Sequence, residues 1–146
     1  MMTNPGPNGR KKGIQSFEES IPFIKEIKFT YGEWLVGYET RKITFKGEDL
    51  FLDVDYSCFN RNGAKPFTQK FPGKKKDFLD ALTALHVGEW EERYDNWNVL
   101  DGYSWSLEIC FSNGHKAVEK GGSNDHPDNF DDFYQLLKIE ENDLMK

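Results

Sequence analysis

Alternation of apolar and polar residues predicts β-strands over much of the chain. The clearest case is residues 103–111, where every odd-numbered residue is large and apolar and every even-numbered one is small or polar. A period of two indicates a strand with one buried face. Residues 23–45 predict two or three further antiparallel strands, with Pro22 at the start of the first, and residues 50–58 predict another.

Short turn signals connect these strands. Asn113-Gly114 is a strong hairpin signal, because both residues accept the positive φ angles of a type I′ turn. The return strand is therefore expected over residues 115–120, followed by a loop at Gly121-Gly122-Ser123-Asn124. Residues 90–102, which contain several aromatic residues without a clear period, are expected to form a packed, irregular connection.

Two segments have the spacing of amphipathic helices. Phe78, Leu82 and Leu85 lie at positions i, i+4 and i+7, and the helix that contains them is expected to end near Gly88. In residues 130–137 the apolar positions are i, i+3, i+4 and i+7, with aspartates at the start, where the helix dipole favours negative charge. A helix is therefore predicted in each segment.

These elements predict an α+β fold: an antiparallel sheet of about five to seven strands with two helices packed on one face. Residues 14–146 are expected to form a single domain, and residues 1–13, rich in Pro, Gly and basic residues, a flexible N-terminal arm. The main predicted contact joins the last strong strand to the last helix. Its residues are Trp105, Leu107, Ile109 and Phe111 on the strand and Phe130, Phe133 and Leu137 on the helix.

Composition narrows the class of protein. The formal net charge of −6 disfavours direct nucleic-acid binding, which needs a basic surface. The negative charge could instead attract a basic partner or simply keep the domain soluble. No apolar run approaches the ~20 residues that cross a bilayer, and the first residues lack the apolar core of a signal peptide. Two cysteines are too few for a disulfide scaffold. A cytoplasmic protein without a membrane segment is expected.

Candidate catalytic groups are few. Asp53 and Asp55 share one face of a strand and could hold a cation or share a proton, although such a face often carries acidic residues for solubility alone. Cys110 could be a partly exposed thiol, with His115 across the hairpin as its base, but packing is the simpler interpretation. The histidines, His86, His115 and His126, lack a second ligand at metal spacing, so no metal or other cofactor is expected.

Surplus aromatic residues favour a binding role. Trp34, close to Gly32 and Gly37, and Trp97, between Asn96 and Asn98, are the tryptophans expected to be partly exposed. Exposed tryptophan commonly anchors protein interfaces. The predicted binding residues are these two tryptophans, with Asp131 and Asp132 as an acidic rim.

The C-terminal third carries a pattern of Trp-x-x-x-Tyr, Asp-Gly-x-x-Trp and Gly-Ser-Asn-x-x-Pro-x-Asn-Phe. In this pattern it resembles small uncharacterised bacterial domains, and the resemblance implies no activity. Most of the matching residues have architectural interpretations as turn glycines, a strand tryptophan and a helix start. They are Trp90, Asp101, Gly102, Trp105, Gly122, Ser123, Asn124, Pro127, Asn129 and Phe130.

Three functional hypotheses follow. The first is a protein-binding module, such as an immunity protein or a phage-type inhibitor, that occludes a basic surface of a partner. The second is a small-ligand-binding domain with an aromatic-lined pocket between sheet and helix. The third is an enzyme that uses Asp53 and Asp55, Glu108 or Cys110.

Overall fold

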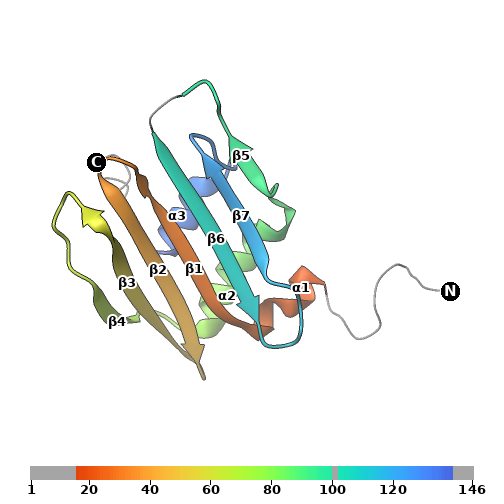
Figure 1. The fold of residues 1–146 in the computed structure, drawn as a ribbon. Helices are drawn as coiled ribbons and strands as arrows, with labels where there is room; N and C mark the ends of the chain where they lie inside the picture. The colour runs from red at the N-terminus through yellow and green to blue at the C-terminus, as the bar shows by residue number, and fades with distance from the viewer. Residues whose placement is uncertain (1–15, 100–101, 140–146) are drawn as a thin grey trace.

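The structure, a computed structural model, describes residues 16–99 and 102–139. These residues form a seven-stranded sheet with helices on one face (Figure 1). The strands are β1 (Ile24–Glu33), β2 (Gly37–Lys46), β3 (Asp49–Asn60), β4 (Phe67–Phe71), β5 (Arg93–Asp95), β6 (Tyr103–Phe111) and β7 (Val118–Ser123). The helices are α1 (Phe17–Ser20), α2 (Lys75–Ala84) and α3 (Phe130–Leu136), with short 3-10 turns η1 (Ile21–Phe23) and η2 (Val87–Glu89). The predicted α+β class is confirmed, and the predicted arm, residues 1–13, lies outside the described residues.

The sheet is mixed, which corrects the prediction of an antiparallel one. Its strand order is β4-β3-β2-β1-β6-β7-β5, and every neighbouring pair is antiparallel except β5 and β7. Arg93 pairs with Gly121 and Asp95 with Ser123 in the parallel register. The predicted irregular connection therefore contains an edge strand. This strand, β5, is too short to show an alternation of apolar and polar residues, and it pairs with β7, which follows later in the chain.

The core lies between the sheet and the helices α2 and α3, which Figure 1 shows on the same face. Trp105 and Phe130 are in direct contact, with ring centroids 4.7 Å apart, and Phe29 of β1 packs against Phe133 at 5.2 Å. All seven residues of the predicted contact are buried, as expected from the two periodicities.

The turn after β6 differs from the predicted type I′ hairpin. Only Gly114 has a positive φ, at +89°, and β7 begins later, at Val118. Asn113 uses its side chain instead: its Oδ1 accepts a hydrogen bond from the His115 backbone N–H at 3.2 Å, and its Nδ2 donates to Ser20 Oγ at 3.0 Å. An Asx-type turn tied to the N-terminal helix has replaced the tight hairpin. The predicted loop at residues 121–124 is strand as far as Ser123.

Two element boundaries differ from the predicted ones, and one strand was not predicted. The helix α2 ends at Ala84, because His86 adopts the left-handed conformation with φ of 51°, and Gly88 lies in η2. The first strand begins at Ile24, since Pro22 belongs to η1. The strand β4 was not predicted, because four of its five residues are exposed and no alternation marks it.

Among the described residues, no helix combines the length and the apolarity that a membrane span requires.

Candidate functional site

Both exposed tryptophans lie at one end of the sheet, where β1 ends and β6 begins. Trp34 belongs to the β1–β2 turn and Trp97 to the β5–β6 connection, and Figure 1 shows these two connections at the same end. Glu33 pairs with Tyr103, so the strands that border the two connections are in direct register. Trp34 is 71% exposed and Trp97 83% exposed. Their exposure is confirmed; their role in binding stays a prediction.

An apolar patch surrounds Trp34. It consists of Trp34, Leu35, Cys58 and Phe59, which come from the β1–β2 turn and the end of β3 and border a hollow of about 480 Å³. Leu35 and Phe59 are each 56% exposed. The patch therefore presents contiguous apolar side chains to solvent.

A β-bulge shapes the backbone beneath this patch. The register of β2 and β3 shifts between Gly37 and Glu39, and bulges of this kind re-aim side chains at sheet ends. Ser57 Oγ accepts the Tyr38 backbone N–H at 3.0 Å and donates to the Phe59 carbonyl. Gly37 has φ of +115°, and a Cβ there would collide with the Phe59 carbonyl. These contacts fix Phe59 in its outward position.

A second hollow, the tyrosine pocket, lies at the same end of the sheet. Its volume is about 340 Å³. Its polar and aromatic lining is formed by Tyr31, Tyr38, Tyr56, Tyr103, Glu33, Glu39, Asn60 and Asn62. Four strands contribute to it, because Tyr31 pairs with Glu39, Glu39 with Tyr56, and Glu33 with Tyr103.

A buried ion pair borders the pocket. Arg41 Nε lies 2.6 Å from Glu39 Oε2, and the two side chains are only 10% and 14% exposed. Burial lowers the pKa of the Arg41 guanidinium, but the charge of Glu39 and the neighbouring Tyr31 raise it by more, so its net pKa is raised. Arg41 is therefore charged, and its pairing with Glu39 compensates the desolvation of the guanidinium.

Two buried tyrosine hydroxyls lie near this pair. Among the described residues, none meets the geometry of a hydrogen bond to the hydroxyl of Tyr31 or of Tyr134, although Glu39 and Arg41 both interact with the Tyr31 hydroxyl. The pKa of Tyr31 is raised, first by burial and then by the charge of Glu39. The pKa of Tyr134 is raised by burial, with further contributions that include Asp131 and Glu39. Tyr31, with 3% exposure, lines the tyrosine pocket, but its hydroxyl oxygen is enclosed beside Glu39 and Arg41.

Tyr103 forms the opposite side of the tyrosine pocket. Burial and the charge of Asp125 raise the pKa of Tyr103 to about 12. Together with Glu39 beside Tyr31, this makes the phenols at this end of the sheet hard to ionise.

The predicted acidic rim is less closely placed. Asp131 and Asp132 are exposed in the first turn of α3, and neither lines the apolar patch or the tyrosine pocket. The charge of Asp131 contributes to the raised pKa of Tyr134.

The alternative catalytic groups are dispersed on the face of the sheet away from the helices. Asp53 Oδ1 accepts a hydrogen bond from Thr68 Oγ1 at 2.6 Å, and Asp55 Oδ1 accepts the Tyr56 backbone N–H at 2.8 Å. In residues 16–99 and 102–139, no three His, Cys, Asp or Glu side chains are arranged to hold a metal ion.

Cys110 and His115 are not brought together. The His115 ring packs against Phe111, with centroids 4.6 Å apart, and Phe111 points to the opposite face of the strand from Cys110. Burial, and after it the charge of Glu108, raises the pKa of the Cys110 thiol, which disfavours the reactive thiolate.

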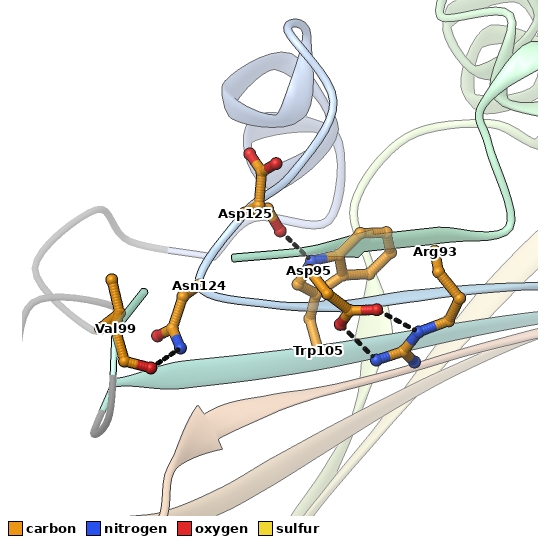
Figure 2. A network of polar contacts seen from close by, with 6 residues as sticks. All are labelled: Arg93, Asp95, Val99, Trp105, Asn124 and Asp125. Atoms are coloured by element: carbon orange, nitrogen blue, oxygen red, sulfur yellow. Dashed lines mark hydrogen bonds and ion pairs between the residues drawn. The ribbon is translucent and has the colours of Figure 1, made fainter. Parts of the chain in front are cut away.

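Two residues of the C-terminal pattern, Trp105 and Asn124, make hydrogen bonds around the loop before α3 (Figure 2). Asn124 has φ of 61°, accepts the Tyr103 backbone N–H through Oδ1 at 3.1 Å, and donates through Nδ2 to the Val99 carbonyl at 3.4 Å. The Trp105 indole donates to the Asp125 carbonyl at 2.9 Å. A Cβ at Gly102 would collide with Asn124. The pattern therefore specifies how the loop before α3 packs on β6; Asp101 lies outside the described residues.

The edge strand β5 carries its own ion pair beside this loop. Arg93 donates from both Nε and Nη2 to the Asp95 carboxylate, at 3.2 and 2.7 Å (Figure 2). Hydrogen bonding to Arg93 lowers the pKa of Asp95. This pair braces the strand and leaves neither group available to the tyrosine pocket.

The tyrosine pocket was not predicted from the sequence. The signal for it is parity: Glu39 and Arg41 alternate in step with Ile43, whose side chain faces the helices and is buried. Charged residues at core-facing positions indicate either a paired buried charge or a site.

No protein-family model matches this chain, and no curated protein is significantly similar to it in sequence. We therefore infer a function from the geometry of the structure.

Proposed function

We propose that the protein is a protein-binding module, of the kind that immunity proteins and phage-type inhibitors represent, and that it occludes a basic surface of its partner. The observation that carries this proposal is the apolar patch, whose Trp34, Leu35 and Phe59 are each more than half exposed and adjacent. Contiguous exposed apolar side chains on a small domain typically mark an interaction site.

The patch has the properties of an interface anchor. Tryptophan is enriched among the residues that dominate binding energy, and it loses little conformational entropy when it is held. The bulge at Gly37 and the hydrogen bonds of Ser57 hold the backbone under the patch before any partner arrives. Trp97, in the β5–β6 connection at the same end of the sheet, is a second exposed tryptophan, at 83% exposure.

Charge supports a basic partner. The chain has a formal net charge of −6, and Glu33, which lines the neighbouring tyrosine pocket, forms no ion pair within the described residues. Asp131 and Asp132 add negative charge on α3. Complementary charge of this kind raises association rates and excludes wrong partners.

The test uses position-specific cross-linking followed by measurement with a purified partner. A photoreactive amino acid replaces Leu35 in one variant and Phe23 in the other, in cells of the source organism. Phe23 is the matched control, because it is a 43% exposed aromatic residue at the opposite end of the sheet. We expect one protein to cross-link from position 35 only.

The cross-linked protein is then purified and titrated with variants. Trp34→Ala should weaken binding by about 2 kcal/mol or more, which is about 30-fold in Kd, while Phe23→Ala leaves the Kd unchanged. Equal Kd values for the two variants would overturn the proposal, and so would the absence of any cross-link specific to position 35.

A further inference from the structure

We propose that the tyrosine pocket binds an alkylammonium group, supplied either by a lysine side chain of the basic partner or by a free primary amine. The lysine source rests on the proposed function, since it assigns the pocket to the same interface as the apolar patch. The binding of an amine as such does not depend on a protein partner.

The sheet register builds the pocket from two adjacent rows of side chains. One row runs Tyr31, Glu39 and Tyr56 across β1, β2 and β3. Neighbours in such a row have Cβ atoms about 4.5–5.5 Å apart, so Glu39 lies between two aromatic rings.

The next row includes a glycine. It runs Tyr103, Glu33, Gly37 and Asn60 across β6, β1, β2 and β3. Gly37 has no side chain, and the backbone leaves no room for one, because a Cβ at this position would collide with the Phe59 carbonyl. The pocket has a volume of about 340 Å³, within the range of about 300–1,000 Å³ typical of small-ligand sites.

The lining is selective for a cation. An ammonium group has three donors and no acceptor, so it needs oxygen acceptors and negative charge. Glu33 offers a carboxylate that forms no ion pair within the described residues. Tyr31 lines the pocket with its ring, because its hydroxyl oxygen is buried beside Glu39 and Arg41. Asn60 Nδ2 already donates to the Ala64 carbonyl at 2.8 Å, which leaves its Oδ1 as an acceptor.

Positive charge is kept out of the lining. Among the described residues that line the pocket there is no lysine, arginine or histidine. Arg41 lies behind Glu39 and is paired with it at 2.6 Å, and the cations of the β3–β4 turn, Arg61 and Lys65, are exposed outside the lining. Burial is the largest cause of the raised pKa of Tyr31 and of Tyr103, and the charges of Glu39 on Tyr31 and of Asp125 on Tyr103 add to it. The carboxylate of Glu33 would repel an anion, whereas a cation gains from this carboxylate and from the tyrosine rings.

The first experiment titrates the isotope-labelled protein with small probes and follows its backbone amide signals by NMR. The probes are butylammonium, Nα-acetyl-lysine methylamide and the neutral isostere Nα-acetyl-norleucine methylamide. We expect saturable shifts at Gly32, Gly37 and Asn60 with the two amines, and affinity at least about tenfold weaker for the norleucine compound. Equal affinity for the norleucine compound, or no saturable shift with either amine, would overturn the proposal.

Variants locate the charge that the amine recognises. Glu33→Gln should weaken amine binding about tenfold, because it removes a charged acceptor while leaving the ion pair of Glu39 and Arg41 in place. Glu26→Gln is the matched control, since Glu26 lies on the same strand with the opposite parity. The amide spectra report whether each variant is folded. Equal weakening by both variants would overturn the assignment to the pocket.

A second arm separates the two sources of the amine and the two proposals. If a lysine of the partner fills the pocket, Glu33→Gln weakens partner binding and butylammonium competes with the partner. If amines bind but partner affinity is unchanged by Glu33→Gln, the free amine is the ligand and the lysine source is wrong. Failure of all amines, with Trp34→Ala still weakening the partner, rejects the pocket proposal alone. Amine binding without any Trp34-dependent partner rejects the proposed function alone.

Discussion

The indole Nε1 of Trp90 donates a hydrogen bond to the side-chain Oδ1 of Asn129 at 3.0 Å, across 39 positions of the chain. The Nδ2 of Asn129 donates in turn to the Leu85 carbonyl at the end of α2, at 2.8 Å. One amide therefore ties the end of α2, the segment after η2 and the start of α3 together. Both Trp90 and Asn129 belong to the C-terminal pattern, and this contact gives their spacing a structural cause.

Asn129→Ala should destabilise the fold by about 1–3 kcal/mol. The substitution leaves the Trp90 N–H, on a side chain that is 7% exposed, and the Leu85 carbonyl without their partner. Urea unfolding measures the effect, with Asn98→Ala as the control because Asn98 is exposed. Equal losses for the two variants would show that the bridge contributes nothing.

Phe133→Ala should cost about 3–5 kcal/mol, because a large side chain is lost from a closely packed position. Phe133 is fully buried, with Phe29 and Trp90 at ring-centroid distances of 5.2 and 5.4 Å. The exposed Phe23, replaced by Ala in parallel, should change stability by less than about 0.5 kcal/mol. A loss below about 1 kcal/mol for Phe133→Ala, measured by urea unfolding, would contradict this account of the core.

The sequence predicted the elements whose periodicity is long and uninterrupted. The strand over residues 103–111 and the helix that begins at Phe130 both present one continuous apolar face, and packing these faces together determines their burial. The strands β4 and β5 escaped prediction, because β4 is mostly exposed and β5 has three residues. A parallel edge pairing such as that of β5 depends on long-range contacts, which local periodicity does not contain.

The exposed tryptophans of the candidate site were predictable from the sequence, but the tyrosine pocket was not. Glycines and asparagines around Trp34 and Trp97 indicated turns, and tryptophans in turns are often exposed. The tyrosine pocket depends on Glu39 and Arg41 at core-facing positions, whereas charged residues in an antiparallel strand are ordinarily assigned to the solvent face. Cross-strand register, which the sequence does not state, brings these charges beside Tyr31.

The ion pair of Glu39 and Arg41 should behave as a coupled unit. Removal of one member leaves a buried charge without its partner, so Arg41→Met or Glu39→Gln alone should cost about 3–5 kcal/mol. The double variant should lose less than the sum of the two single losses, because no buried charge remains. A double-mutant cycle by urea unfolding gives the coupling energy. Additive losses would mean that the two side chains are solvated independently, against their burial in the structure.

Alkaline pH should weaken the fold through Tyr103. Its pKa is about 12 in the folded state, against about 10 in an unfolded chain, so the unfolded state ionises first as pH rises. The unfolded state then binds fewer protons than the folded one, and the free energy of unfolding falls between about pH 10 and pH 12. Tyr31 and Tyr134 act in the same direction, since burial raises the pKa of each.

The contribution of Tyr103 is separated from that of the other phenols by substitution. Tyr103→Phe removes one of these ionisations, so its stability should decline less steeply over this window than that of the wild type. Phe23→Ala carries no change in ionisable groups and should keep the wild-type slope. Urea unfolding at a series of pH values, with tyrosinate absorbance followed in native protein, measures both quantities. An unchanged slope in Tyr103→Phe would show that this phenol titrates alike in the folded and unfolded chains, and that it is as accessible to water as the remaining surface tyrosines.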